Sequence, residues 1–163
     1  MDRASVCGAM LALLLVPAVQ AETVRKYNVY AADGVMAGEQ VTTVGDDGWV
    51  HVKYGYKDNG RGPDYVEEFR LAPDGTFSEY RIKGNSTFGA EVDEHFNTDG
   101  KQAHWASRSE HGDAPMVAGA LYLPLNNTFE TESVMLSQAL SHGGKVALMP
   151  NGEVSYRKLD EAE

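Results

Sequence analysis

The chain has 163 residues, of which 14 are Lys or Arg and 24 are Asp or Glu, so its formal net charge is −10. This balance argues against nucleic acid and anionic membrane surfaces as partners, because both require a basic face on the protein. The one cysteine, Cys7, lies near the N-terminus. Residues 22–163 can therefore form no disulfide, thiolate nucleophile or cysteine-based metal site.

The first residues have the three-part layout of a secretory signal. Arg3 is followed by the apolar run 10–16, by Pro17 and by small or modest residues up to Ala21. This pattern predicts a signal peptide over 1–21 and export of the chain, with no stable membrane span after cleavage. An uncleaved anchor is the alternative. A chain without cysteine after the signal suits the periplasm of a Gram-negative bacterium, which is the expected location.

Repeated turn signals dominate the next hundred residues. Asp-Gly and Asn-Gly pairs favour tight hairpin turns, because both residues tolerate a positive φ. Short runs rich in β-branched and aromatic residues lie between them and predict strands. The turn pairs begin at residues 33, 47, 59, 74, 99 and 151, and the first three strands are expected at 24–31, 38–44 and 49–56.

The strand pattern predicts an antiparallel meander with one buried face. In the third strand, Val50, Val52, Tyr54 and Tyr56 share a face, and Lys and His lie on the other. The later strands are marked by apolar residues, which we expect to share that face: Tyr65, Phe69 and Leu71, then Tyr80 and Ile82, Val92 and Phe96, and Ala103 and Trp105.

The pattern changes in the C-terminal half. Pro124 keeps the apolar run 118–125 from being a central strand. Val134, Leu136, Ala139 and Leu140 then recur at helical spacing, which predicts a helix over about 130–142. Thr128 or Thr131 is its expected N-cap and Gly143-Gly144 its end, and a final hairpin follows over 145–157. The expected fold is mainly β (α+β): one domain over 22–163, an antiparallel sheet of about 7–9 strands covered by the helix.

No complete catalytic constellation is evident. The histidines lack the His-x-His and His-Glu-x-x-His spacings of metal sites, and the serines lack the Gly-x-Ser-x-Gly and Ser-x-x-Lys frames. The carboxylate pairs Glu67-Glu68 and Asp93-Glu94 point to opposite faces of a strand, so neither pair shares a substrate. We therefore predict no catalytic residue, metal or cofactor. An alternative metal site would use His95, His104 and His111, brought together across a hairpin.

One loop and two tyrosines are candidates for docking a ligand or a partner. The loop 56–64 contains Asp58, Arg61 and Asp64, and Arg61 has the geometry to grip a carboxylate. Tyr54 and Tyr56 are candidates for lining a ligand groove, although their alternating strand spacing is more typical of core residues. The competing interpretation is a surface turn, in which Arg61 pairs with Asp58 or Asp64, and tyrosines that belong to the core.

An ordered series of motifs resembles a known family. Residues 51–63 are similar to the Tyr-x-Tyr-Asn-Asp-Arg-Gly-Arg-Gly-Pro stretch of an N-terminal region found in exported bacterial amidohydrolase-family proteins. Further matches are 92–96, 99–100, 105–107, 120–125 and 138–150, so the resemblance covers about residues 27–154.

The resemblance implies an accessory domain. In that family the β-rich region precedes a metal-dependent barrel that supplies His-x-His, whereas this chain has no His-x-His and ends at Glu163 before any barrel. No catalytic residue carries over. We expect a non-catalytic periplasmic domain that packs against a hydrolase barrel, fused or separately encoded, or a stand-alone relative of it. Two alternatives stay open: a free-standing small-molecule binder that uses the sheet face, and an independent hydrolase that uses His95, His104 or His111.

Overall fold

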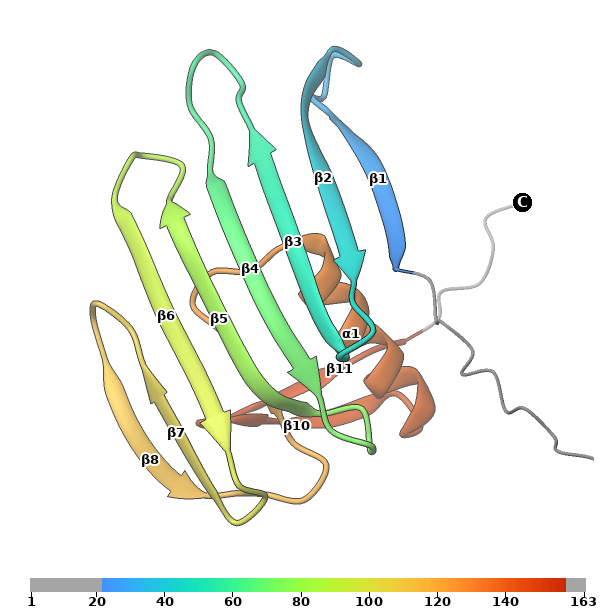
Figure 1. Cartoon of the computed structure of the whole chain (residues 1–163), viewed down its shortest axis with the longest axis vertical. Coiled ribbons are helices and arrows are strands. Elements are labelled where there is room, and N and C mark those ends of the chain that lie inside the picture. The colour runs from blue at the N-terminus through green and yellow to red at the C-terminus, as the bar shows by residue number, and fades with distance from the viewer. Residues whose placement is uncertain (1–21, 158–163) are drawn as a thin grey trace, which may run out of the picture.

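The computed structural model describes residues 22–157, in which an eight-stranded antiparallel sheet follows the chain order (Figure 1). Each strand pairs with the next, as hairpin-length connections dictate. The strands are β1 (Thr23–Tyr30), β2 (Met36–Val44), β3 (Trp49–Tyr56), β4 (Asp64–Leu71), β5 (Phe77–Asn85), β6 (Glu91–Thr98), β7 (Gln102–Ala106) and β8 (His111–Pro115).

In most of the Asp-Gly turns the glycine has a positive φ, a conformation that other residues rarely adopt. In the β1–β2 turn, the Gly34 amide donates to Ala31 O at 2.9 Å and the Ala31 amide donates to Val35 O at 2.8 Å, with Gly34 at φ 81°. This is a type I turn closed by a left-handed residue. The same pattern of hydrogen bonds recurs at 45–49, 72–76 and 86–90.

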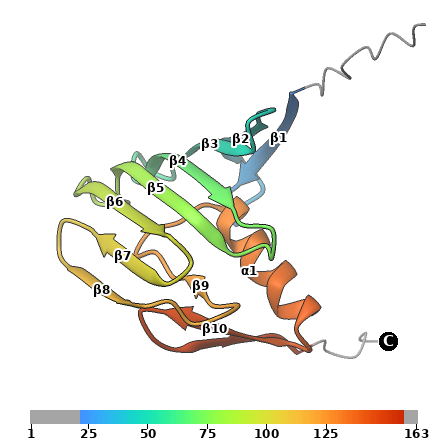
Figure 2. The same ribbon diagram turned by 60° about the horizontal axis from the view of Figure 1, so that its bottom comes forward.

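A second layer covers one face of the sheet, which we call the inner face (Figure 2). It consists of α1 (Phe129–Ser141) and a three-stranded sheet of β9 (Leu121–Tyr122), β10 (Lys145–Met149) and β11 (Glu153–Ser155). β9 and β10 are parallel, whereas β10 and β11 form an antiparallel hairpin. The core lies between the two layers.

The core is aromatic and is built in rows across the sheet. Phe69 and Phe77 meet edge to face at 5.3 Å between ring centroids, and Phe96 stacks on Tyr122 at 4.5 Å. Burial of such rings supplies most of the stabilisation of a domain this small. The fully buried large side chains include Tyr80, Tyr122, Phe69, Phe77, Phe96 and Ile82.

The predicted fold class is confirmed, because the sheet is a meander of eight strands with a single helix in the C-terminal half. β3 has the predicted bounds, and the final hairpin is β10–β11. Two features were not predicted: β8, and the parallel pairing of β9 with β10. The signal peptide predicted over 1–21 lies outside the described residues.

Two details of the predicted core are wrong. Leu71 does not share the inner face, since a bulge between Arg70 and Leu71 interrupts the alternation and leaves Leu71 exposed. The helix buries Thr131, Met135 and Ala139 instead of its leucines. Leu136 and Leu140 are exposed.

Residues 22–157 contain no helix with the length and apolar character that a membrane crossing requires.

Candidate functional site: an aromatic pocket at the start of the helix

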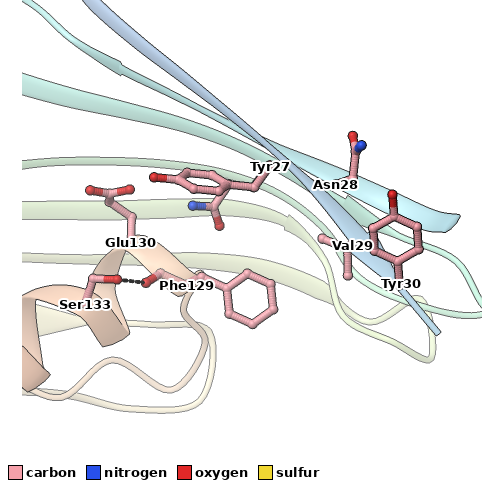
Figure 3. Close-up of a pocket in the computed structure, with 8 residues that line it drawn as sticks. Tyr27, Asn28, Val29, Tyr30, Phe129, Glu130 and Ser133 are labelled. Atoms are coloured by element: carbon pink, nitrogen blue, oxygen red, sulfur yellow. Dashed lines mark hydrogen bonds between the residues drawn. The ribbon is translucent and has the colours of Figure 1, made fainter. Parts of the chain in front are cut away.

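A pocket of about 440 Å³ opens between the edge of the sheet and the first turn of α1 (Figure 3). Tyr27 extends from β1 toward Glu130, and the Phe129 ring turns toward Val29. The volume falls in the range of sites for small organic molecules. The lining residues are Tyr27, Asn28, Val29, Tyr30, Gln40, Phe129, Glu130 and Ser133.

Strand register and the helix cap place these residues together. Tyr27 lies directly opposite Gln40 in the β1–β2 ladder, so both side chains project from the same face. Thr128 caps α1 by accepting a hydrogen bond from the Glu130 amide at 3.2 Å, which fixes Phe129 as the first helical residue. Phe129 then meets Tyr54 edge to face at 5.4 Å. The pocket therefore has an aromatic wall on its helix side.

A chain of polar contacts runs behind the pocket. Arg25 Nη2 donates to Glu130 Oε1 at 2.5 Å, and Thr42 Oγ1 donates to Glu130 Oε2 at 2.9 Å. Gln40 Nε2 donates to Thr42 Oγ1 at 3.3 Å. Within the described residues, Gln40 Oε1 is buried and has no hydrogen-bond partner. A buried carbonyl oxygen without a hydrogen-bond donor is unfavourable, so a ligand that donates to it would be stabilised.

The position of the helix start depends on a carboxylate buried in the sheet. Glu67, on β4, is fully buried and accepts hydrogen bonds from Tyr80 Oη at 2.7 Å, Thr128 Oγ1 at 2.5 Å, the Thr128 amide at 3.2 Å and Thr131 Oγ1 at 2.8 Å. These contacts turn the Thr131 side of α1 inward, which explains why the predicted leucine face is exposed. Burial raises the pKa of Glu67, and the hydrogen bonds only partly oppose that effect.

A second buried carboxylate fixes the segment that leads to the helix. Glu94 Oε1 accepts from Tyr122 Oη at 2.7 Å and from the Leu125 amide at 3.0 Å. Burial raises the pKa of Glu94 and, together with the nearby Glu94 carboxylate, that of the Tyr122 phenol. Neither Glu67 nor Glu94 is accessible to a substrate, so both support structure rather than chemistry.

The five predicted docking residues do not form one surface. Tyr54 packs on the inner face beside the pocket, in agreement with the expectation that the tyrosines belong to the core. Tyr56 projects from the same face near the end of β3 and is half-buried, whereas Asp64 lies opposite Gly55 and projects from the outer face. Asp58 and Arg61 are exposed in the turn beyond β3.

That turn is tighter than the predicted long loop. Asp58 and Arg61 exchange two backbone hydrogen bonds around Asn59 and Gly60, whose φ values are 51° and 76°. This is a two-residue type I′ turn. Within the described part of the chain, no ion pair joins Arg61 to Asp58 or Asp64, so the predicted surface pairing is not found.

Arg61 instead lines a second pocket, of about 630 Å³, between two hairpin tips. Lys57 lies beside it, and its ammonium donates to Gly62 O at 2.5 Å. Across the pocket is the β5–β6 turn, whose Phe88 side chain is 85% exposed. Two cations and an exposed ring thus meet at one end of an acidic protein.

The three histidines of the alternative metal site are not brought together. His95, His104 and His111 are exposed and lie on the outer face, on three successive strands. His95 and His111 both face Ala106, one from each side, so a whole strand separates them. Within residues 22–157, no three His, Cys, Asp or Glu side chains are placed to hold a metal ion.

Sequence reasoning missed Gln40, Glu67, Glu94 and Phe129. A signal for the two acids was present, because Glu67 lies two residues from Tyr65 and Phe69, and Glu94 alternates in the same way with Val92 and Phe96. An acid in an inward position of a strand must be buried with partners. No comparable signal marks Gln40 or Phe129, whose roles depend on a contact between distant segments.

Comparisons of the chain with known protein families, with curated proteins and with solved structures give no match.

Proposed function

We propose that this chain is a non-catalytic, exported binding domain that holds a small, flat aromatic molecule between β1 and the first turn of α1. The observation that carries the proposal is a pocket with aromatic walls and a buried acceptor, Gln40 Oε1, that has no hydrogen-bond partner within residues 22–157. Apolar walls with a few polar groups that fix orientation are typical of small-molecule sites.

The aromatic walls favour a ring over a flexible chain. Tyr27, Tyr30 and Phe129 are 48%, 58% and 46% exposed, which leaves ring faces free for an incoming molecule. Stacked or edge-to-face contacts with such rings add to the gain from burial. Glu130 adds little net charge at the site, since Arg25 pairs with it, so the ligand class proposed is neutral.

Titration with indole, followed by NMR, tests the proposal. We expect saturable shifts at residues of β1 and at Phe129 and Ser133, with a dissociation constant of about a millimolar or less for so small a probe. Phe129→Ala removes one wall and should weaken binding about tenfold. Phe88→Ala is the matched control, because it removes an exposed phenylalanine at the hairpin tips. Non-saturable shifts, or equal losses in both variants, would contradict the proposal.

The hairpin-tip pocket supports a second candidate function. We propose that Arg61, Lys57 and Phe88 dock a partner protein with an acidic surface. The resemblance to the N-terminal region of amidohydrolase-family proteins suggests a hydrolase barrel as this partner. The single supporting observation is the grouping of two cations with an exposed ring in a chain of net charge −10.

Pull-down of a hydrolase encoded in the neighbouring reading frame tests this second candidate. Arg61→Ala and Phe88→Ala should each reduce recovery, whereas Phe129→Ala should not. A pure monomer that recovers no hydrolase at any concentration would rule the candidate out.

A further inference from the structure

The hydrogen bonds behind the aromatic pocket determine which atom of the Gln40 amide faces it. Glu130 is held between Arg25 and Thr42, at 2.5 and 2.9 Å. A carboxylate paired with a guanidinium carries no proton, so it can only accept. The Thr42 hydroxyl must therefore donate its one hydrogen to Glu130.

This assignment leaves Thr42 Oγ1 with acceptor positions only. Gln40 lies 3.3 Å from it and can satisfy it only through the amide nitrogen. The Gln40 carbonyl oxygen is consequently turned away from Thr42. The salt bridge at Arg25 thus sets the orientation of an amide at the far end of the contact chain.

In this series of hydrogen-bonded groups, the carbonyl oxygen of Gln40 is the one that has no partner in the described residues. Gln40 is 1% exposed, and Tyr27 is its neighbour in the ladder with β1. β1 is an edge strand, Tyr27 is half exposed, and Gln40 lines the pocket beside it. A buried acceptor favours a ligand that donates to it and disfavours one that does not.

We propose that the pocket selects flat aromatic molecules that carry an N–H or O–H donor directed at Gln40 Oε1. This specificity rests on the proposed binding function and adds the chemical class of its ligand. Aromatic compounds of the same shape with only an acceptor at that position bind more weakly.

Indole and benzofuran separate these two classes, because they share a shape and differ in having N–H or O in the five-membered ring. Dissociation constants from NMR titration of the wild-type protein should be about tenfold smaller for indole. Thr42→Val removes the hydroxyl that orients the amide. Gln40 can then present its NH₂ group, and the preference should fall to about twofold or less.

Two further variants serve as a second test and as a control. Gln40→Met keeps the volume and removes the acceptor, so it should lose the preference even if Thr42→Val fails to fold. Ser133→Ala also lines the pocket but has its hydroxyl bonded to Phe129 O, outside this chain of contacts, and it should keep the preference.

The outcomes distinguish the specificity from the binding function. Equal saturable binding of indole and benzofuran by the wild-type protein would overturn the specificity and leave the binding function standing. A preference that survives in both Thr42→Val and Gln40→Met would also overturn it. Failure of both probes to bind would overturn the binding function, and the specificity with it.

Discussion

Glu67 and Glu94 lie in one row of the sheet, separated only by Ile82, and both are buried on the inner face. Together they join the 122–131 segment to the middle of the sheet by accepting hydrogen bonds from Tyr122, Leu125, Thr128 and Thr131. Burial of two carboxylates is unfavourable, so each needs its hydrogen-bond donors in place to offset this effect.

Removal of the Glu67 carboxylate should destabilise the domain strongly. Glu67→Ala leaves the Thr128 amide and the Thr131 hydroxyl without their buried acceptor, and we expect a loss of about 3 kcal/mol in the free energy of unfolding. Glu67→Gln keeps an acceptor oxygen and should cost about 1 kcal/mol. Urea unfolding measures both.

Glu68→Ala is the control for this pair of variants. Glu68 is the next residue on β4 and projects from the outer face, where its half-exposed carboxylate lies 3.0 Å from His51 Nδ1. Its loss should change the free energy of unfolding by about 0.5 kcal/mol or less. A similar cost for Glu67→Ala and Glu68→Ala would contradict the role given to Glu67.

The stability of the domain should depend on pH through the two buried acids. The pKa values of Glu67 and Glu94 are raised above 4.5, mainly by burial. The folded state therefore binds more protons than the unfolded state above pH 4.5. The stability that these groups contribute is fully present below that pH and is lost as the pH rises through their folded pKa values.

Glu94→Gln isolates this effect from that of the other carboxylates. Relative to the wild-type protein, the variant should gain stability as the pH rises from 4.5 toward 8, because its neutral amide does not ionise. Each tenfold increase in the proton affinity of Glu94 between the unfolded and the folded state contributes about 1.4 kcal/mol to this gain. Urea unfolding across this range measures the difference, and a difference that does not change with pH would count against raised pKa values.

Gly62 is required for the turn that carries Arg61. Its φ is 149°, and a Cβ there would overlap the carbonyl oxygen of Tyr56. Gly62→Ala should therefore cost about 2 kcal/mol or more in thermal or urea unfolding. Gly55→Ala is the matched control, since Gly55 has an ordinary φ and open space around it, and it should be nearly neutral.

The helix cap should be worth more than an ordinary surface cap. Thr128→Ala removes both the acceptor for the Glu130 amide and the buried hydroxyl that donates to Glu67. We expect a loss of about 2 kcal/mol in urea unfolding. Ser141→Ala, in the last turn of the same helix and exposed, should cost much less, and equal costs would show that the contact with Glu67 adds nothing.

The sequence predicts the meander well because its signals are local. Each Asp-Gly or Asn-Gly pair determines a turn from two residues, and β3 alternates so regularly that its bounds and inner face are both predicted. β8 is missed because His111-Gly112-Asp113-Ala114-Pro115 has little strand character and is held by pairing with β7.

The pocket is harder to predict for a physical reason. Tyr27 and Phe129 are distant in the chain, and the contacts of Glu67 with Thr128 and Thr131 help to fix how α1 lies on the sheet. Helical spacing alone indicates Leu136 and Leu140 as the buried face, which the structure shows to be exposed. The strand position of Tyr54 predicts its inward direction, but its contact with Phe129 depends on that docking.

The strand order of the large sheet also has a consequence for how the domain folds. Every β1–β8 pairing joins consecutive strands, so each hairpin can form without waiting for a distant segment, whereas the bonds from Glu67 to Thr128 and Thr131 span 61 and 64 residues. We expect the sheet to form early and the helix to dock late. Thr128→Ala should then accelerate unfolding in stopped-flow experiments and leave the refolding rate almost unchanged.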